Sequence, residues 1–405
     1  MIVKNFFHKN FTVSIIILLS LVIIESNFFR FFQNKTLYQF VPWLSNYQGG
    51  FTRRGLPGEF LLQISELLNI HLGWIAFIFV CILYILFYFS FLILIKNLNL
   101  NNLFLFAIFS PLAFYFPVLN SKASGHKDII FLCLLTIFCI FVSKFKKNHA
   151  NYFMIFSAAF IILSHEGLVF YLTYLIIPFI AFFKFDDYKK LLFNLFPLAI
   201  VVLFATALIH FFNGSAQHVE KICESIKFYS DPGCTIAGQI SFLKNTIKYN
   251  ISSRNAVEVL GVLAYSKYFI IYSIGFIYGF IPLIILYWRS KMSSSIAGKK
   301  IHPLIFLILP LVASLPIYYM AADWGRYLYI SYMSSLIILF FSLNNGIFII
   351  KKNKDFFKDS KLKNFLTVLL LTIYCLGWTV PICCETNFKS GIYSSVKKVI
   401  YYSNK

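Results

Sequence analysis

The fold is decided by residues 74–95, which read WIAFIFVCILYILFYFSFLILI. This stretch carries no charged side chain, and it is long enough to cross a bilayer as one helix, which takes about 20 apolar residues. Similar apolar runs recur outward from it in both directions. The sequence therefore predicts a membrane protein made of helices.

The composition agrees with this. Of the 405 residues, 59% are hydrophobic, 20% are aromatic and only 13% are charged, which is more apolar surface than a soluble domain buries. The 36 Lys and Arg outnumber the 15 Asp and Glu, but they are scattered between apolar runs without a nucleic-acid-binding motif. We expect no nucleic-acid partner, because membrane orientation and anionic lipid account for the basic residues.

We predict an all-α, polytopic transmembrane bundle of about eleven spans that forms one integral-membrane domain over residues 1–405. The expected spans are 11–30, 74–95, 103–119, 126–143, 150–165, 167–183, 191–212, 267–288, 303–320, 327–349 and 364–382. The pair 150–165 and 167–183 could instead form one re-entrant hairpin. The first apolar run is followed by Glu25 and bulky residues, so we expect an uncleaved span and not a signal peptide.

A cytoplasmic N-terminus satisfies the positive-inside rule. It places on the inside Lys96, Lys144, Lys146, Lys147, Lys184, Lys189, Lys190, Arg289, Lys291, Lys299, Lys300 and the basic run 351–363. Two long loops, about 31–73 and 213–266, then lie outside.

Both outer loops contain candidate interfacial helices. From Pro57 to Ile70, one face carries Phe60, Ile64, Leu67 and Leu68. In the second loop, apolar side chains recur at helical spacing at Ile236, Ile240, Leu243, Ile247 and Ile251. Each segment could roof a cavity that opens from the lipid, or could simply pack against the ends of the spans.

The eight cysteines show no metal-ligand spacing, and we expect no metal or other cofactor. The alternative is a metal-dependent enzyme that uses Asp128, Glu166 and Asp323, although their spacing is not that of a known metal site. Cys223 and Cys234 share a polar loop. They could form a disulfide in an oxidising compartment, or remain two free thiols.

Four polar clusters fall on the same side of the membrane when the spans are counted. They are residues 49–55 (GGFTRRG), 125–128 (GHKD), 164–167 (SHEG) and 323–326 (DWGR). Charge at membrane depth is costly, so several such groups on one face indicate a functional site.

In the first cluster, Gly49 and Gly50 precede Arg53 and Arg54, just before a predicted helix start. Glycines let a ligand approach the backbone, and guanidinium groups bind phosphate oxygens in a fork. A phosphate or pyrophosphate site is one interpretation, and a turn whose arginines bind lipid headgroups is the other.

As helices, the apolar runs 129–142 and 152–163 are too short to cross the hydrocarbon core of a bilayer, which is about 30 Å thick. The residues beside them, His126, Lys127 and Asp128 in one case and His165 and Glu166 in the other, are therefore expected below the membrane surface. His126, Lys127 and Asp128 are candidates for substrate binding, and Glu166 with His165 is a candidate general base. Mutual neutralisation or helix capping is the simpler alternative.

The fourth cluster joins two spans by a short connection. Asp323 and Arg326 stand three residues apart and could pair on one helical turn. Alternatively, Arg326 faces a phosphate while Asp323 accepts a proton. Trp324 and the tyrosines near it could stack on sugars, although aromatic belts are common at membrane interfaces.

With its many spans, its glycine–arginine first outer loop and its further charged clusters on that face, the chain resembles the O-antigen polymerases of bacterial polysaccharide synthesis and, more broadly, GT-C type membrane glycosyltransferases. The resemblance implies an inner-membrane enzyme whose active face is periplasmic and whose substrate is an undecaprenyl-pyrophosphate-linked oligosaccharide. Other polysaccharide-assembly membrane proteins would be partners.

By that resemblance, Arg53, Arg54 and Arg326 would bind the pyrophosphate, and Glu166, His165 or Asp323 would accept the proton of the incoming hydroxyl. The polymerases commonly place catalytic arginines in two large outer loops, whereas the second loop here contains only Arg254.

Two other functions stay open. A GT-C enzyme that moves one sugar from a polyprenyl phosphate would be expected to use an acidic residue of the first outer loop, such as Glu59. A flippase or other transporter would place charges along a central path and show inverted repeats, whereas these clusters crowd one face and no repeat is visible.

Overall fold

The structure is a computed structural model that describes residues 2–29, 31–32, 40–120, 122–185, 187–226, 234–235, 238–293, 295–296, 301–350, 361–388 and 391. Lys299, Lys300 and most of the basic run 351–363 lie outside these residues. Within them the chain is almost entirely helical, with one two-stranded sheet. The predicted all-α membrane protein is thus confirmed in its class.

Six helical segments of the described chain are long and apolar enough to cross a membrane. They are Asn10–Phe29 within α1 (Ile2–Phe29), α3 (Leu72–Ile95), η4 with α8 (Glu166–Tyr171 and Thr173–Phe183), α9 (Tyr188–Phe211), α14 (Val262–Arg289) and α16 (Trp324–Asn344). The predicted count of eleven is not confirmed. Four expected spans coincide with further helices outside that set, namely α6 (Asp128–Lys144), α7 (Lys147–Ser164), α15 (Ile305–Met320) and α17 (Lys361–Leu376).

One expected span, 103–119, is not a continuous helix. It consists of α4 (Asn102–Ile108) and α5 (Phe116–Leu119), separated by a turn that contains Pro111. Proline cannot donate a helical hydrogen bond and disfavours helix in the residue before it, Ser110. The Ser110 hydroxyl instead donates to the carbonyl of Gly279 in α14.

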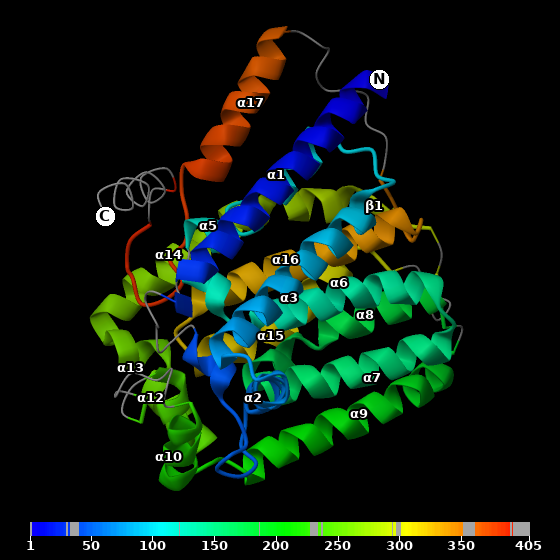
Figure 1. Cartoon of the computed structure of the whole chain (residues 1–405). Helices are drawn as coiled ribbons and strands as arrows, with labels where there is room; N and C mark the ends of the chain where they lie inside the picture. Colours follow the sequence, from blue (N-terminus) through cyan, green and yellow to red (C-terminus); the bar gives the residue numbers. More distant parts are fainter. Residues whose placement is uncertain are drawn as a thin grey trace.

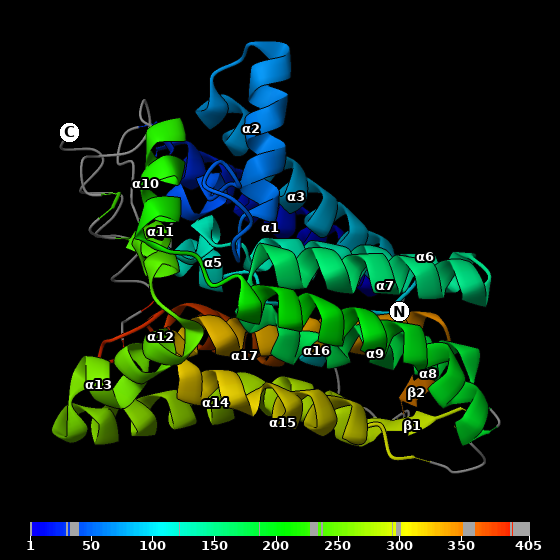
Figure 2. The same cartoon turned by 90° about the horizontal axis from the view of Figure 1, so that it is seen from below.

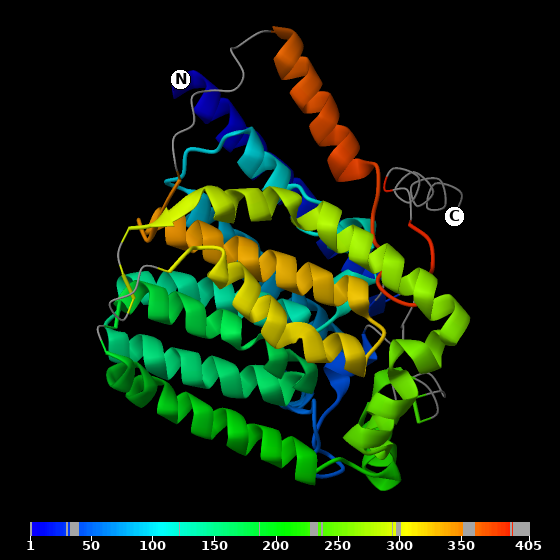
Figure 3. The same ribbon diagram turned by 180° about the vertical axis from the view of Figure 1, so that it is seen from behind.

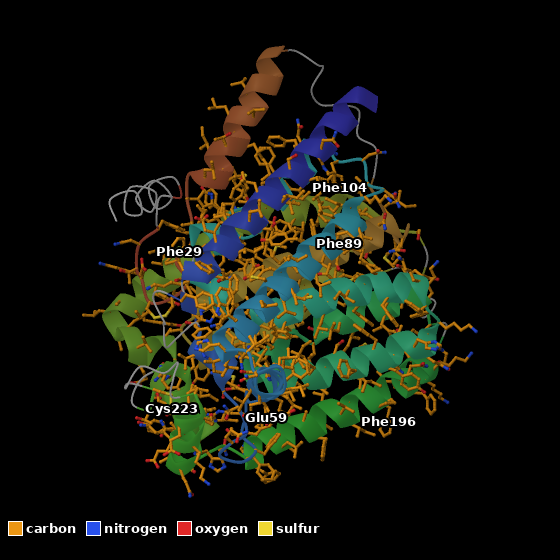
Figure 4. The ribbon with its side chains drawn as sticks, in the orientation of Figure 1. Phe29, Glu59, Phe89, Phe104, Phe196 and Cys223 are labelled. Carbon is orange, nitrogen blue, oxygen red and sulfur yellow. A yellow bond between two sulfur atoms is a disulfide. The ribbon has the colours of Figure 1, made fainter. Side chains whose placement is uncertain are left out.

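Helix α16 forms the centre of the bundle, with α3, α6, α8, α14 and α15 packed around it (Figure 1). Its side chains are buried from Trp324 to Ser342, so it is enclosed on all sides, as expected of a helix without a polar face. Helix α9 lies at the edge of the bundle and exposes Phe196, which Figure 4 labels together with Phe89 of α3. These outer apolar side chains are suited to contact with lipid.

The two ends of the bundle differ. At one end, β1 (Ser290–Met292) pairs antiparallel with β2 (Phe348–Ile350). At the other end lie the short helices of the second outer loop (Figure 2). These are α10 (Ala216–Ser225), α11 (Gly238–Ser241), η5 (Phe242–Lys244), α12 (Ile247–Arg254) and α13 (Ala256–Leu260). We call this second end the loop end.

The first outer loop contains η2 (Val41–Leu44) and the expected helix, α2 (Leu56–Leu68). Pro57 stands in the first turn of α2, and Asn69 ends it in the left-handed conformation. Leu61 is fully buried, whereas Phe60, Leu67 and Leu68 of the predicted apolar face are exposed. The helix thus presents apolar side chains outward, as an interfacial helix does.

The prediction of one continuous interfacial helix in the second outer loop was wrong. Ile240 and Leu243 are buried in α11 and η5, and the backbone is extended at Asn245 and Thr246 before α12 starts. The Thr246 hydroxyl accepts a hydrogen bond from the Tyr249 N–H, which caps α12 and fixes the break. Ile236 lies outside the described residues.

Candidate functional site

Three helix ends and the first outer loop meet at the loop end of the bundle. Lys127 and Asp128 start α6, with η3 (Ala123–Gly125) just before them, and His165 and Glu166 join α7 to η4. Asp323 and Arg326 stand at the start of α16. Together with His126, Arg53 and Arg54, they form what we call the charged cluster. The predicted convergence of the four sequence motifs is therefore present for their charged residues.

Arg54 and Glu166 form a two-point ion pair. Arg54 Nε donates to Glu166 Oε2 at 2.6 Å, and Arg54 Nη2 donates to Oε1 at 2.5 Å. Arg54 has a positive φ of 66°, which is uncommon for a residue with a side chain. Fork-to-carboxylate pairs are the stronger kind of charge-assisted hydrogen bond. Glu166 is thus committed to Arg54, which weakens its candidacy as a general base.

Arg53 connects the two outer loops. Its Nη2 donates to the carbonyl oxygens of Phe242 at 2.7 Å and Asn245 at 3.0 Å, on the turn between η5 and α12. Its Nη1 lies 3.5 Å from Asn213 Oδ1, and its Nε lies 3.8 Å from Glu166 Oε1. Most of its donors are therefore used within the protein.

The two arginines differ in electrostatic environment. Burial lowers the pKa of Arg53 below its ordinary value, and the charge of Glu166 opposes this shift only in part. Burial also acts to lower the pKa of Arg54, but the charge and hydrogen bonds of Glu166 outweigh it and raise that pKa. Arginine starts so high that both side chains are cations at neutral pH.

Arg326 is the centre of the second half of the charged cluster. Its Nε lies 2.7 Å from Asp128 Oδ2, and its Nη2 donates to Asp128 Oδ1 at 3.2 Å. Its Nη1 donates to Asp323 Oδ2 at 2.7 Å. The ion pair weighed for Asp323 and Arg326 from their spacing is thus present, but the more buried partner is Asp128, from α6.

Two histidines flank this guanidinium. His126 Nδ1 lies 3.3 Å from Arg326 Nη1, and His165 Nε2 lies 3.4 Å from Nη2. The Gly167 N–H donates to His165 Nδ1. Because Nδ1 accepts from Gly167, the single proton of a neutral imidazole is on Nε2, and the Arg326 contact is then not a hydrogen bond. A second proton, on Nδ1, would point at the Gly167 N–H and add a positive charge beside Arg326. The geometry favours a neutral His165.

Of the four basic side chains of the charged cluster, Lys127 is the one with no ion pair to a carboxylate of the cluster. Only 3% of it is exposed, and its Nζ donates to the carbonyl oxygen of Arg54 at 2.8 Å. Burying an ammonium group without a counter-ion is expensive. Such a group marks a position where an anion would be stabilised.

Basic side chains outnumber carboxylates in the charged cluster. Its cations are Arg53, Arg54, Lys127 and Arg326, and its carboxylates are Glu166, Asp128 and Asp323. With the histidines neutral and Lys127 protonated, one positive charge is left uncompensated, which an anionic ligand would balance. The buried arrangement is therefore suited to an anionic ligand.

Three of the residues predicted for the site, Gly49, Gly50 and Glu59, contribute to the packing and hydrogen bonding of the outer loops instead. A side chain on Gly49 would collide with the backbone of His218 in α10, and Gly50 has a φ of +109°, so both glycines let the two outer loops pack closely. Glu59 accepts hydrogen bonds from the Tyr47 N–H and from Gln63. These contacts lie within the first loop and are not part of the charged cluster.

Trp324 also lies outside the charged cluster. Its indole N–H donates to the Tyr318 carbonyl, and its ring packs among other rings. These rings belong to Tyr265, Tyr268, Phe269, Tyr272 and Tyr318. Only 8% of Trp324 is exposed, so it anchors α14 and α15 around the start of α16.

Other contacts of the cluster were not found by sequence reasoning. Asn213, Gln239 and the carbonyls of Phe242 and Asn245 contact the arginines. No charge or glycine pattern marks these residues, because their role comes from the folding of the second loop. In that loop, Cys223 and Cys234 form a disulfide.

Among the residues that the structure describes, no group of three or more His, Cys, Asp or Glu is arranged to hold a metal ion. Comparison with known proteins gives no further guidance, because no protein-family model, curated protein or solved structure matches this chain.

Proposed function

We propose that this protein is a membrane glycosyltransferase that polymerises a lipid-linked glycan, in the manner of an O-antigen polymerase. The observation that carries the proposal is the charged cluster itself, beneath two outer loops at one end of an apolar bundle. Its buried basic side chains outnumber its carboxylates, and Lys127 has no carboxylate partner within the cluster. A polyprenyl pyrophosphate has the matching chemistry, with an anionic head and an apolar tail.

The reaction would transfer the growing glycan. An acceptor sugar hydroxyl attacks the anomeric carbon, a new C–O bond forms, and the bond from that carbon to the pyrophosphate oxygen breaks. The hydroxyl proton passes to a base, and the lipid pyrophosphate leaves with the bonding electron pair. Positioning and cationic stabilisation of the leaving group are the contributions that the protein must make.

Asp323 is the best base in this proposal. Its side chain is 33% exposed and it holds Arg326 through one oxygen. Asp128 and Glu166, by contrast, each use both oxygens on a guanidinium group. A base must reach the substrate hydroxyl, which favours the carboxylate with an accessible oxygen.

The lipid tail would approach along the membrane. Phe60, Leu67 and Leu68 of α2 form an outward apolar face next to the loop end. An interfacial helix of this kind can lie at the headgroup level, where it would guide a polyprenyl chain while its pyrophosphate enters the cluster.

The positions of the basic connections support one orientation of the bundle in the membrane. In Figure 2 the sheet and the α6–α7 connection lie opposite the loop end. Lys146 lies in this connection, and Lys144 and Lys147 are the helix-end residues on either side of it. Under the positive-inside rule, this arrangement supports an orientation with the loop end on the periplasmic side of the bacterial inner membrane.

The alternative GT-C transferase is less well supported, because Glu59 makes its hydrogen bonds to Tyr47 and Gln63 and not in the charged cluster. A flippase is less well supported because the charged groups gather at one end of the bundle.

The test uses purified protein in liposomes with undecaprenyl-pyrophosphate-linked oligosaccharide. We expect a ladder of longer glycans with the wild type and with Glu59→Gln, and none with Asp323→Asn. Loss of activity in Glu59→Gln alone would favour the single-sugar transferase. Movement of the substrate across the bilayer without any bond formation would favour the flippase.

A further inference from the structure

A cavity of about 240 Å³ lies in the second outer loop, outside the charged cluster. Its walls come from η5, α12 and the residues beside them. They are Ser241, Phe242, Lys244, Asn245, Tyr249, Asn250, Ser253 and Arg254. Figure 3 shows the green helices of this loop from behind, gathered at one end of the bundle.

The size of the cavity suits a small polar group. Pockets that enclose drug-sized ligands start at about 300 Å³, so this space corresponds to one sugar residue and not to a whole oligosaccharide. A longer glycan could extend out of the cavity through its opening, because Lys244, Tyr249 and Ser253 are exposed.

The chemistry of the walls has three parts. Ser241, Asn245, Asn250 and Ser253 bring hydroxyl and amide groups, which exchange hydrogen bonds with sugar hydroxyls. The ring of Tyr249 offers a surface on which the C–H face of a sugar packs. Lys244 and Arg254 add two positive charges, and no acidic residue lines the cavity.

Arg254 is held in a defined position. Its guanidinium carbon lies 3.2 Å from the centre of the Phe242 ring, a cation–π contact. Stacking of this kind fixes the plane of the guanidinium group, whose N–H groups lie along its edge. A planar carboxylate is the group that such an edge binds in two places.

The cavity is coupled to the charged cluster through Arg53. The carbonyl oxygens of Phe242 and Asn245, two of the lining residues, both accept hydrogen bonds from Arg53 Nη2. Asn250 Nδ2 also donates to these two oxygens. Arg53 therefore fixes the turn that walls the cavity, and it holds that turn next to Glu166 of the cluster.

We infer that this cavity is a glycan subsite for a sugar residue that bears a carboxylate, with Lys244 and Arg254 as its charge-selective contacts. The inference rests on the proposed function for its biological meaning, since it names a substrate class for that reaction. It makes Arg53 a positioning residue that joins glycan binding to the cluster. Neutral hydrogen-bonding groups outnumber the cations in the walls, which favours an acidic sugar over a bare phosphate.

The experiment measures binding of small soluble probes to the full-length protein in lipid nanodiscs by saturation-transfer NMR. The probes are methyl glucuronide, the neutral methyl glucoside and inorganic pyrophosphate. We expect methyl glucuronide to bind at least about tenfold more tightly than methyl glucoside, which corresponds to ~1.4 kcal/mol. Lys244→Ala and Arg254→Ala should each weaken glucuronide binding by about the same factor.

Lys248→Ala is the matched control, because Lys248 lies on the same helix but does not line the cavity. It should leave glucuronide binding unchanged, and Arg254→Lys should retain part of it by keeping the charge. Equal binding of the two glycosides would overturn the inference. So would equal losses in Lys248→Ala and Arg254→Ala, or binding of pyrophosphate with the same dependence on Arg254.

This binding result is separate from the test of the proposed function. Glucuronide binding without glycan elongation in liposomes would leave the subsite in place and remove the polymerase proposal. Elongation without glucuronide binding would leave the polymerase proposal in place and remove the subsite.

Discussion

Arg54 and Glu166 lie 112 residues apart in the chain and meet through two hydrogen bonds of 2.6 and 2.5 Å. The pair ties the first outer loop to the junction between α7 and η4. A second ion pair, between Arg326 and Asp128, ties α16 to α6. The charged cluster is therefore also the point where the two outer loops and the helix ends are joined.

The double variant Glu166→Gln with Arg54→Gln should lose less stability than the sum of the losses of the two single variants. Glu166→Gln alone leaves a partly buried guanidinium group without its carboxylate, whereas the double change removes both charges. For contacting residues, we expect a coupling free energy of ~0.5–3 kcal/mol, measured by thermal unfolding in detergent. Strictly additive losses would show that the pair does not contribute to stability.

The two carboxylates on Arg326 should differ in their effect on stability. Asp128 is 4% exposed at its side chain and makes two contacts to Arg326, and its change to Asn should cost about 3–5 kcal/mol. The Asp323 side chain is 33% exposed, and Asp323→Asn should lower the free energy of unfolding by only ~0.2–1 kcal/mol. Unfolding temperatures of the two variants compare these effects directly, and an equal or larger loss for Asp323→Asn would disagree with the geometry.

Lys127→Met should separate stability from activity. The change removes a buried amino group whose hydrogen bond, within the described part of the chain, goes to the Arg54 carbonyl and not to a carboxylate, so the unfolding temperature should stay the same or rise. Glycan elongation should fall by about 100-fold, the effect of losing one group that stabilises a leaving anion. The exposed Lys122→Met is the control, and full activity in Lys127→Met would exclude Lys127 from the site.

Membrane orientation can be measured by labelling introduced cysteines. In a variant without other free thiols, Ser252→Cys in α12 should react with a membrane-impermeant maleimide on intact spheroplasts. Lys146→Cys, between α6 and α7, should react only after permeabilisation. The opposite pattern would reverse the proposed periplasmic face. The Cys223–Cys234 disulfide is consistent with an oxidising compartment on that side.

Much of the helix pattern could be predicted because apolar runs of membrane length are explicit in the sequence. The exception at 103–119 arose because Pro111 was read as part of a span, and proline interrupts the hydrogen bonds of a helix. The second-loop helix failed because helical spacing of apolar side chains continued across Asn245 and Thr246, where a side-chain cap starts a new helix.

The members of the charged cluster could be predicted from the position of charges near helix ends, but their pairing could not. Nothing in the spacing of Asp323 and Arg326 indicates that Asp128 is the more buried partner of Arg326. Gly49 and Gly50 were interpreted as a ligand cradle, and in the structure they allow close packing against His218. Such roles depend on tertiary contacts that local sequence does not encode.

The most direct measurement of the central claim is glycan elongation by the purified wild-type protein and Asp323→Asn in liposomes, with lipid-linked oligosaccharide as the only glycan. We predict a ladder of products and release of undecaprenyl pyrophosphate by the wild type, and neither by a folded Asp323→Asn variant. Unchanged substrate in the presence of folded wild-type protein, or equal ladders from both proteins, would contradict the account.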